Sequence, residues 1–164
     1  MTVEPVDDEG LAGPLARIIN AAYAIGEGGL WLPGTERIDE ATVAGHIRTG
    51  EMLGAPLDGR IAGCARVHLL DPATGEVGLV STDPHAWGHG IGRALVAAAE
   101  DRMRARGAST MQLQILTPRG RAHPGKARLR DWYERLGYRF ARTEPFAAPR
   151  LTTPCEFEIF RKRL

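Results

Sequence analysis

Cysteine is scarce in this 164-residue chain, which has Cys64 and Cys155 and no other. The two stand far apart in strand-like segments; they could pair, but we expect two buried thiols of a cytoplasmic protein. The cysteines and the five histidines also lack the short spacings of metal ligands. We therefore expect no bound metal.

Long apolar runs and an excess of one charge are missing as well. No stretch approaches the roughly 20 apolar residues that cross a bilayer, and the acidic segment Met1–Glu9 has no signal-peptide core. The net charge of +1 gives no reason to expect a nucleic-acid or anionic-membrane partner. The remaining composition is that of an ordinary globular protein, and we expect one domain spanning residues 1–164.

The stretch Asp83–Arg93 carries three glycines at alternate positions, Gly88, Gly90 and Gly92, between an apolar strand and an alanine-rich helix. Glycine permits positive φ and lets a ligand approach the backbone. Free N–H groups at the start of a helix, together with the positive end of its dipole, form a site for phosphate or pyrophosphate. The alternative is a glycine-rich turn that binds nothing.

The sequence of this segment does not match either of two common phosphate-binding motifs. A Walker loop ends in Gly-Lys-Ser/Thr, whereas Gly92 is followed by Arg-Ala. A dinucleotide fingerprint needs Gly-x-Gly-x-x-Gly, and counted from Gly88 or Gly90 its last position falls on Arg93 or Leu95. Both mismatches argue against an ATP- or NAD-binding protein.

Hydrophobic periodicity and turn residues divide the chain into eleven elements. Strands are expected near 2–6, 51–57, 60–70, 76–82 and 109–116, from 138–140 onward, and near 155–160. Helices are expected near 8–25, 39–48, 90–106 and 126–136. The glycine-rich segment 26–34 is expected to be a mobile loop, although it carries the large apolar side chains Leu30 and Trp31. The element order predicts an α+β (mixed α/β) fold, with a central, mostly antiparallel twisted sheet and about four flanking helices.

Two motifs resemble those of the GNAT N-acetyltransferase superfamily. The hexapeptide Trp87–Gly92 is similar to its pyrophosphate loop, Gln/Arg-x-x-Gly-x-Gly/Ala, with Trp87 in place of the usual Gln or Arg. Residues 129–138, Leu-Arg-Asp-Trp-Tyr-Glu-Arg-Leu-Gly-Tyr, resemble the late helix of the family. The element order matches the GNAT fold over essentially the whole chain, and the two motifs follow in the right order.

The resemblance implies a cytoplasmic enzyme that transfers an acyl group, most simply acetyl from acetyl-CoA, directly to a primary amine of a small molecule or peptide, without a metal. The alternative is a non-catalytic acyl-CoA-binding or regulatory module on the same fold. A homodimer stays open, and no nucleic-acid or membrane partner is expected. The resemblance places cofactor contacts at Val80, Ser81, Thr82, Trp87, Gly88, His89, Gly90, Ile91, Gly92 and Arg93, with a backbone N–H near Val80 polarising the thioester.

Catalytic roles also follow from the resemblance. Tyr133 matches a family tyrosine that protonates the departing thiolate; its other interpretation is a core residue with a buried hydroxyl. Glu76 begins the strand that enters the glycine loop and is the first candidate for a general base acting through water. Glu76 could equally be an exposed carboxylate at a strand end, and Glu27 is the second candidate.

The acceptor pocket of this family is usually shaped by the loop between the first two helices. On this chain that places Tyr23, Glu27 and Trp31 around the acceptor. Aromatic walls beside a carboxylate suit a small amine with an apolar body. Trp31 could equally be a plug in the hydrophobic core.

Overall fold

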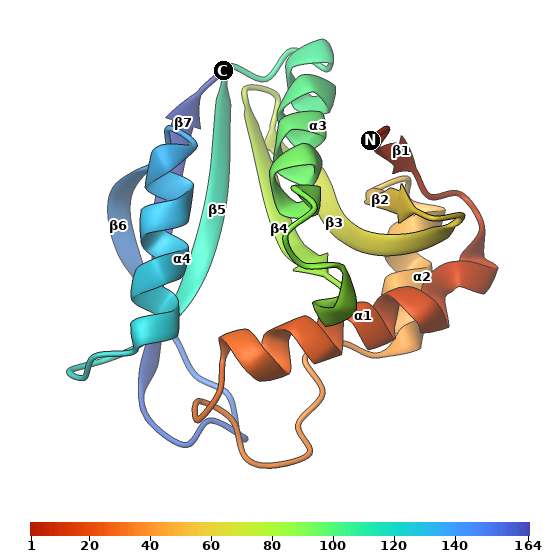
Figure 1. Cartoon of the computed structure of the whole chain (residues 1–164). Helices are drawn as coiled ribbons and strands as arrows, with labels where there is room; N and C mark the ends of the chain where they lie inside the picture. The colour runs from red at the N-terminus through yellow and green to blue at the C-terminus, as the bar shows by residue number, and fades with distance from the viewer.

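One seven-stranded sheet, in the order β1-β2-β3-β4-β5-β7-β6, organises the computed structural model, which describes all residues 1–164 (Figure 1). The strands are β1 (Glu4–Pro5), β2 (Met52–Leu57), β3 (Arg60–Asp71), β4 (Thr74–Thr82), β5 (Thr110–Pro118), β6 (Arg139–Phe146) and β7 (Cys155–Arg163). The helices are α1 (Ala12–Gly26), α2 (Glu40–Arg48), α3 (Ile91–Ala105) and α4 (Pro124–Arg135).

All neighbouring strands pair antiparallel except β4 and β5, which run parallel. The predicted fold class is confirmed: a mixed α+β chain with a mostly antiparallel sheet and four helices. The parallel pair is short, because only Thr74–Glu76 faces Thr110–Gln112 before the strands separate. Figure 1 shows β4 and β5 diverging beyond this point, with α1 crossing below the gap.

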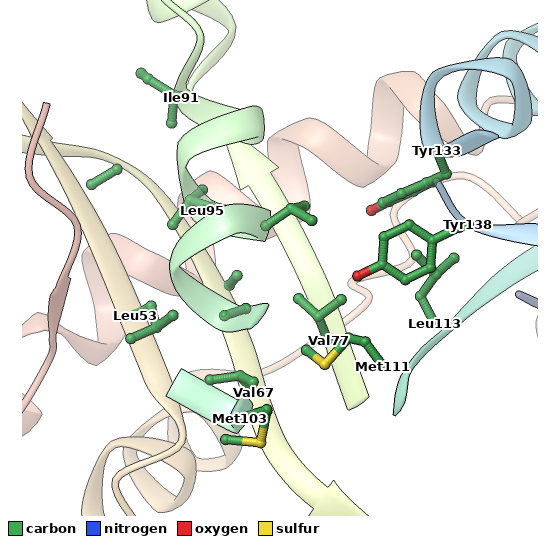
Figure 2. Packing of buried hydrophobic residues seen from close by; sticks show 14 of the residues in the cluster. Leu53, Val67, Val77, Ile91, Leu95, Met103, Met111, Leu113, Tyr133 and Tyr138 are labelled. Carbon is green, nitrogen blue, oxygen red and sulfur yellow. The ribbon is translucent and has the colours of Figure 1, made fainter. Parts of the chain in front are cut away.

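Helices cover both faces of the sheet, as strand alternation requires. On β2 and β3, Met52 and Cys64 pack beneath α1 and α2, whereas Leu53 and Ala65 point to the opposite face and pack beneath α3. Figure 2 shows this second layer, in which α3 and α4 side chains meet those of the strands. The larger buried cluster therefore lies on the face that also carries the glycine turn.

Local chemistry accounts for the helix starts. Asp39 accepts a hydrogen bond from the Thr42 amide at 2.7 Å and begins α2, and His123 begins α4 ahead of a proline in the first turn. Gly90 begins α3 in the left-handed region, at φ 74°, where a residue without Cβ is favoured.

The loop after α1 is fastened to later segments of the chain. Leu30 is fully buried against Leu116 and Cys155. The Leu30 carbonyl accepts from the Thr152 amide at 2.9 Å, and the Leu32 amide donates to the Arg150 carbonyl at 2.8 Å. This segment is therefore an anchored part of the fold rather than the mobile connector that its glycines predict.

Cys64 and Cys155 are both free and buried, in agreement with the expectation of two thiols. No helix combines the length and the apolar character needed to traverse a bilayer. No three His, Cys, Asp or Glu side chains converge in a way that could hold a metal ion.

Candidate active site

A cavity of about 300 Å³ lies where β4 and β5 separate. Val77–Val80 of β4 and Leu113–Leu116 of β5 form its two sides. The strand β5 stays paired with β7 as far as Pro118. The backbone groups of β5 that face the cavity are therefore not needed to hold the strand in the sheet.

A β-bulge helps to turn β4 away. Cys64 of β3 faces Ser81 and Arg66 faces Gly78, so that two residues of β4, Leu79 and Val80, stand opposite one residue of β3. Leu79 has a φ of 52°, an uncommon conformation for a side chain of its kind. Bulges of this type redirect side chains and end regular pairing.

The opening passes through the sheet, so side chains from both faces reach it. From the face of α4 come Leu129 and Tyr133, and from the face of α1 come Tyr23 and Glu27. A ligand that extends through the gap therefore contacts groups on both faces at once.

The glycine turn leaves its backbone donors free. None of the seven N–H groups from Trp87 to Arg93 donates a hydrogen bond within the protein, and the first bond of α3 runs from the Ala94 amide to the Gly90 carbonyl at 3.0 Å. A Cβ at Gly88 or Gly90 would meet nothing within 4 Å. Unpaired amides in open space at a helix N-terminus suit a diphosphate.

The side chains of this turn differ in what they can offer. Ile91 is buried and presents only its amide. Arg93 and Trp87 are exposed, and the Trp87 indole donates to the Thr82 carbonyl at 3.3 Å. The His89 Nδ1 lies 3.1 Å from the Ala86 carbonyl oxygen, so the tautomer that bonds there carries its proton on Nδ1.

Val80, Ser81 and Thr82 at the end of β4 have different environments. Val80 lines the cavity. Ser81 is buried, and its hydroxyl donates back to the Leu79 carbonyl at 3.0 Å. Thr82 is half-buried, and its carbonyl accepts the indole bond.

Tyr133 is buried at one wall of the cavity, and its hydroxyl has no hydrogen-bond partner in the protein. Its ring points from α4 toward β4 (Figure 2) and packs edge-on against Trp132 and Tyr138. Burial raises the pKa of Tyr133 above its ordinary value, which keeps the phenol protonated. The hydroxyl is thus a neutral donor facing the opening.

Glu76 reaches the cavity from the face of α1. One carboxylate oxygen accepts a hydrogen bond from the side-chain Nε2 of Gln112 at 3.0 Å, and the other lies 3.9 Å from Nε2 of His68. Burial, followed by the charge of Arg66, lowers the pKa of His68 and favours its neutral form. Sequence reasoning missed His68, whose only signal is its place opposite Glu76 in the β3–β4 register.

Glu27 is buried and held by three donors. Lys126 Nζ lies 2.9 Å from one carboxylate oxygen, and Arg37 Nε and the Trp31 indole (3.1 Å) bond the other. Trp31 does not line the cavity. It forms a β-bridge with Leu151 and packs against the buried cluster of Leu30, Leu116 and Cys155. Sequence reasoning missed Arg37 and Lys126, since nothing local to either residue marks them as partners of Glu27.

Tyr23 lies at the cavity wall below the bulge. Burial of its hydroxyl, followed by the nearby charge of Glu27, raises the pKa of Tyr23 to about 12. Like Tyr133 it is a neutral phenol, so the two tyrosines present uncharged hydroxyls from opposite faces of the sheet.

The sequence profile of the Acetyltransferase (GNAT) family matches residues 20–138, which include both walls of the cavity and the glycine turn. The chain belongs to this GNAT acetyltransferase family. The resemblance inferred from the two motifs is thereby confirmed.

Individual acetyltransferases are similar to this chain either over part of its length or at low sequence identity. Mycothiol acetyltransferase from Beutenbergia cavernae is 36% identical over 81 residues, which are 49% of this chain and 25% of that protein. The chain thus spans about a quarter of the length of this curated relative.

Two solved structures share the fold over essentially the full length of both chains. Ribosomal-protein-alanine N-acetyltransferase from Brucella melitensis superposes with a TM-score of 0.73 at 20% identity, covering 100% of each chain. Rv2747 from Mycobacterium tuberculosis, solved in complex with CoA, gives 0.70 at 17% identity, covering 100% of this chain and 99% of that one.

The chain has three tyrosines, and burial raises the pKa of each. A raised folded-state pKa for a phenol stabilises the fold below the unfolded pKa of about 10, and this contribution is lost as the pH rises above it. We expect little tyrosinate absorbance at pH values near 10 while the fold persists, and its appearance together with loss of the circular dichroism signal. A tyrosine that ionises near pH 10 in the folded protein would contradict this.

Proposed function

We propose that the chain is an acyl-CoA-dependent N-acyltransferase that moves an acetyl group from acetyl-CoA directly to a primary amine of a small molecule or peptide. The observation that carries the proposal is the row of seven unpaired amides, Trp87–Arg93, beside a cavity that passes through the sheet. Family membership supports the same reaction class. Acetyl-CoA supplies the activated thioester, and the chain supplies binding, orientation and proton transfer.

The residues present fit such a cosubstrate. Backbone donors of the turn, with Arg93 and His89 at its rim, would hold the diphosphate. Free backbone between Val80 and Thr82 and along β5 would pair with the extended pantetheine arm as a strand pairs with a sheet edge. The bulge at Leu79 brings backbone amides to the cavity, where a donor would polarise the thioester carbonyl.

Proton transfer is assigned to one carboxylate and one phenol of the cavity, Glu76 and Tyr133. Glu76 would accept a proton from the acceptor ammonium, directly or through a water, and the free amine would then attack the thioester; one oxygen of Glu76 has only a distant histidine beside it. Glu27 suits this role less, since three donors already occupy its carboxylate. Tyr133, a neutral donor with a free hydroxyl, would give its proton to the departing thiolate.

The rival is a regulatory module that binds acyl-CoA without turnover. It would favour Glu76 and Tyr133 pointing into the core; both line the cavity, and Tyr133 also packs in the core beneath α4. The two free cysteines support the proposed cytoplasmic location, since thiols persist in a reducing compartment. A homodimer remains a prediction.

Gly90→Val tests cosubstrate binding. A β-branched residue at φ 74° must reshape the turn and obstruct its amides, so we expect CoA affinity to fall by about tenfold or more in calorimetry. Gly59→Val is the matched control, because Gly59 has a φ of 77° and open space but lies in the β2–β3 turn. Equal CoA affinity in the two variants, or stabilisation of the native protein by ATP or NAD alone, would sink the proposal.

Tyr133→Phe removes the proposed acid while keeping the ring. We expect kcat to fall on the order of 10²-fold, with little change in KM for acetyl-CoA, because the hydroxyl acts on the leaving group. Tyr138→Phe serves as control: its hydroxyl donates to Glu100 at 2.9 Å, outside the cavity, so stability should fall and kcat should not. A Tyr133 variant with native kcat strips this residue of its role.

Glu76→Gln removes the proposed base with little change of shape. We expect kcat/KM to fall by about 10²-fold at neutral pH and to recover as the pH approaches the pKa of the acceptor amine, because free amine then attacks without help. Glu134→Gln, on the exposed face of α4, should behave as the native protein does. A native-like pH profile for the Glu76 variant would assign the base elsewhere.

A further inference from the structure

Two arginines at the acceptor side of the cavity have guanidinium ends that bind nothing in the protein. Arg37 uses Nε for Glu27, and Arg66 uses Nε for Glu51 at 2.7 Å. Their Nη atoms have no protein acceptor, and they are not sealed in the core. Both side chains line the cavity and also the neighbouring groove beside α2.

The orientation of Arg37 is set before any ligand arrives. Its guanidinium stacks on the rings of Tyr23 and Trp31, with centroid distances of 5.0 and 4.8 Å. Glu27, itself bonded to Lys126 and Trp31, holds the Nε edge. A stacked guanidinium with one edge occupied presents its remaining donors in a fixed plane, which suits an anion with two coplanar oxygens.

Arg66 stands beside the proposed base. Arg66 pairs with Gly78 and His68 with Glu76 in the same antiparallel ladder, so Arg66 and Glu76 are diagonal neighbours on one face of the sheet. Such neighbours are roughly 7–8 Å apart. A Cβ on Gly78 would meet nothing within 4 Å, so there is open space between the two side chains.

Three cations, Arg37, Arg66 and Lys126, stand beside three carboxylates, Glu27, Glu51 and Glu76. Only Glu27 and Glu51 are paired with these cations, so a ligand that brings an ammonium group to Glu76 leaves one cation for a negative group. His46 and His68 have pKa values lowered by burial and then by Arg66, which keeps them neutral.

Two carboxylates, Glu36 and Asp39, line the outer groove rather than the cavity. One oxygen of the Asp39 carboxylate accepts a hydrogen bond from the Thr42 backbone amide at the start of α2, which fixes this side chain outside the cavity. The exposed Glu36 lies at the outer rim, where it would meet solvent or the far end of an acceptor.

We propose that the acceptor is a small amine carrying a carboxylate, the chemistry of a free amino acid, with the carboxylate bound by Arg37 and Arg66 and the amine directed to Glu76. This assignment rests on the proposed function and narrows its acceptor class. Tyr23 and Leu79 form the apolar wall for the substituent of the acceptor.

The test compares free L-amino acids with their α-carboxamides, which keep the amine and side chain but lack the charge. Thiol release from acetyl-CoA is measured for the twenty pairs. We expect the best acid to exceed its carboxamide in kcat/KM by about tenfold or more, although the amide carries the less basic amine. O-Phosphoethanolamine as the best acceptor would overturn the carboxylate assignment, and so would a peptide amine with no carboxylate nearby.

Variants of the two arginines test whether they cause the preference for the acid over its carboxamide. Arg66→Gln should raise KM for the acid by about tenfold and leave KM for the carboxamide unchanged, since only the acid loses a charged hydrogen bond. Arg37→Gln should raise KM for the acid as well, but it should also slow the carboxamide, because Arg37 holds Glu27 at the cavity wall. Arg66→Lys, which keeps the charge but loses the fork, should give an intermediate preference. Arg17→Gln, an exposed arginine of α1 outside the cavity, is the control.

The carboxylate site and the transferase activity are overturned by different results. Turnover of acids and carboxamides at equal rates, unaffected by Arg66→Gln, overturns the carboxylate site and leaves the transferase intact. Absence of turnover with every amine overturns the transferase and the acceptor class together.

Discussion

The early end of pairing between β4 and β5 is the constraint on which the site depends. Backbone N–H and C=O groups in a protein interior must find partners. Where two strands separate, the backbone groups on their facing edges no longer bond each other. The fold tolerates this because β5 is held along its other edge by β7, from Thr110 to Pro118. The resulting opening admits an extended polar ligand and joins the two faces of the sheet, so groups from α1 and α4 can act on one reacting centre.

Buried charge gives this opening its shape. Glu27 and Lys126 are both nearly inaccessible, and such a pair costs more in desolvation than it returns unless every oxygen is bonded. Here Arg37 and Trp31 complete the shell of Glu27, and the network ties the end of α1 to the start of α4. Because both elements carry walls of the cavity, the network fixes the position of these walls relative to each other.

Much of this architecture is readable from local sequence, since turn residues and periodicity act over short distances. Asp58–Gly59 and the glycines at 88, 90 and 92 locate a hairpin and a helix start without reference to the rest of the chain. What the sequence leaves open has long-range causes. The strand β7 continues beyond the predicted Phe160 to Arg163 because β5 pairs with it, and the end of β6 at Phe146 has no apolar pattern to mark it, because β6 is a largely exposed edge strand.

The residues of the candidate site also fall into those that local sequence predicts and those that depend on long-range contacts. Glu76 and Tyr133 stand in recognisable motifs, and the structure brings both to the cavity wall. Arg37, Arg66 and His68 carry no local signal, because their roles depend on a loop contact and on the register between β3 and β4.

The fastening of the loop after α1 has an evolutionary consequence. Its backbone is bonded to residues 150–152, and the Gly28 carbonyl lies 3.0 Å from Nε2 of His123. The segment after α1 is thus held in place by two stretches that are remote from it in sequence. Residues 26–35 grafted alone from a relative would lack the partners that position their backbone, so this loop can change its conformation only together with the stretches that hold it.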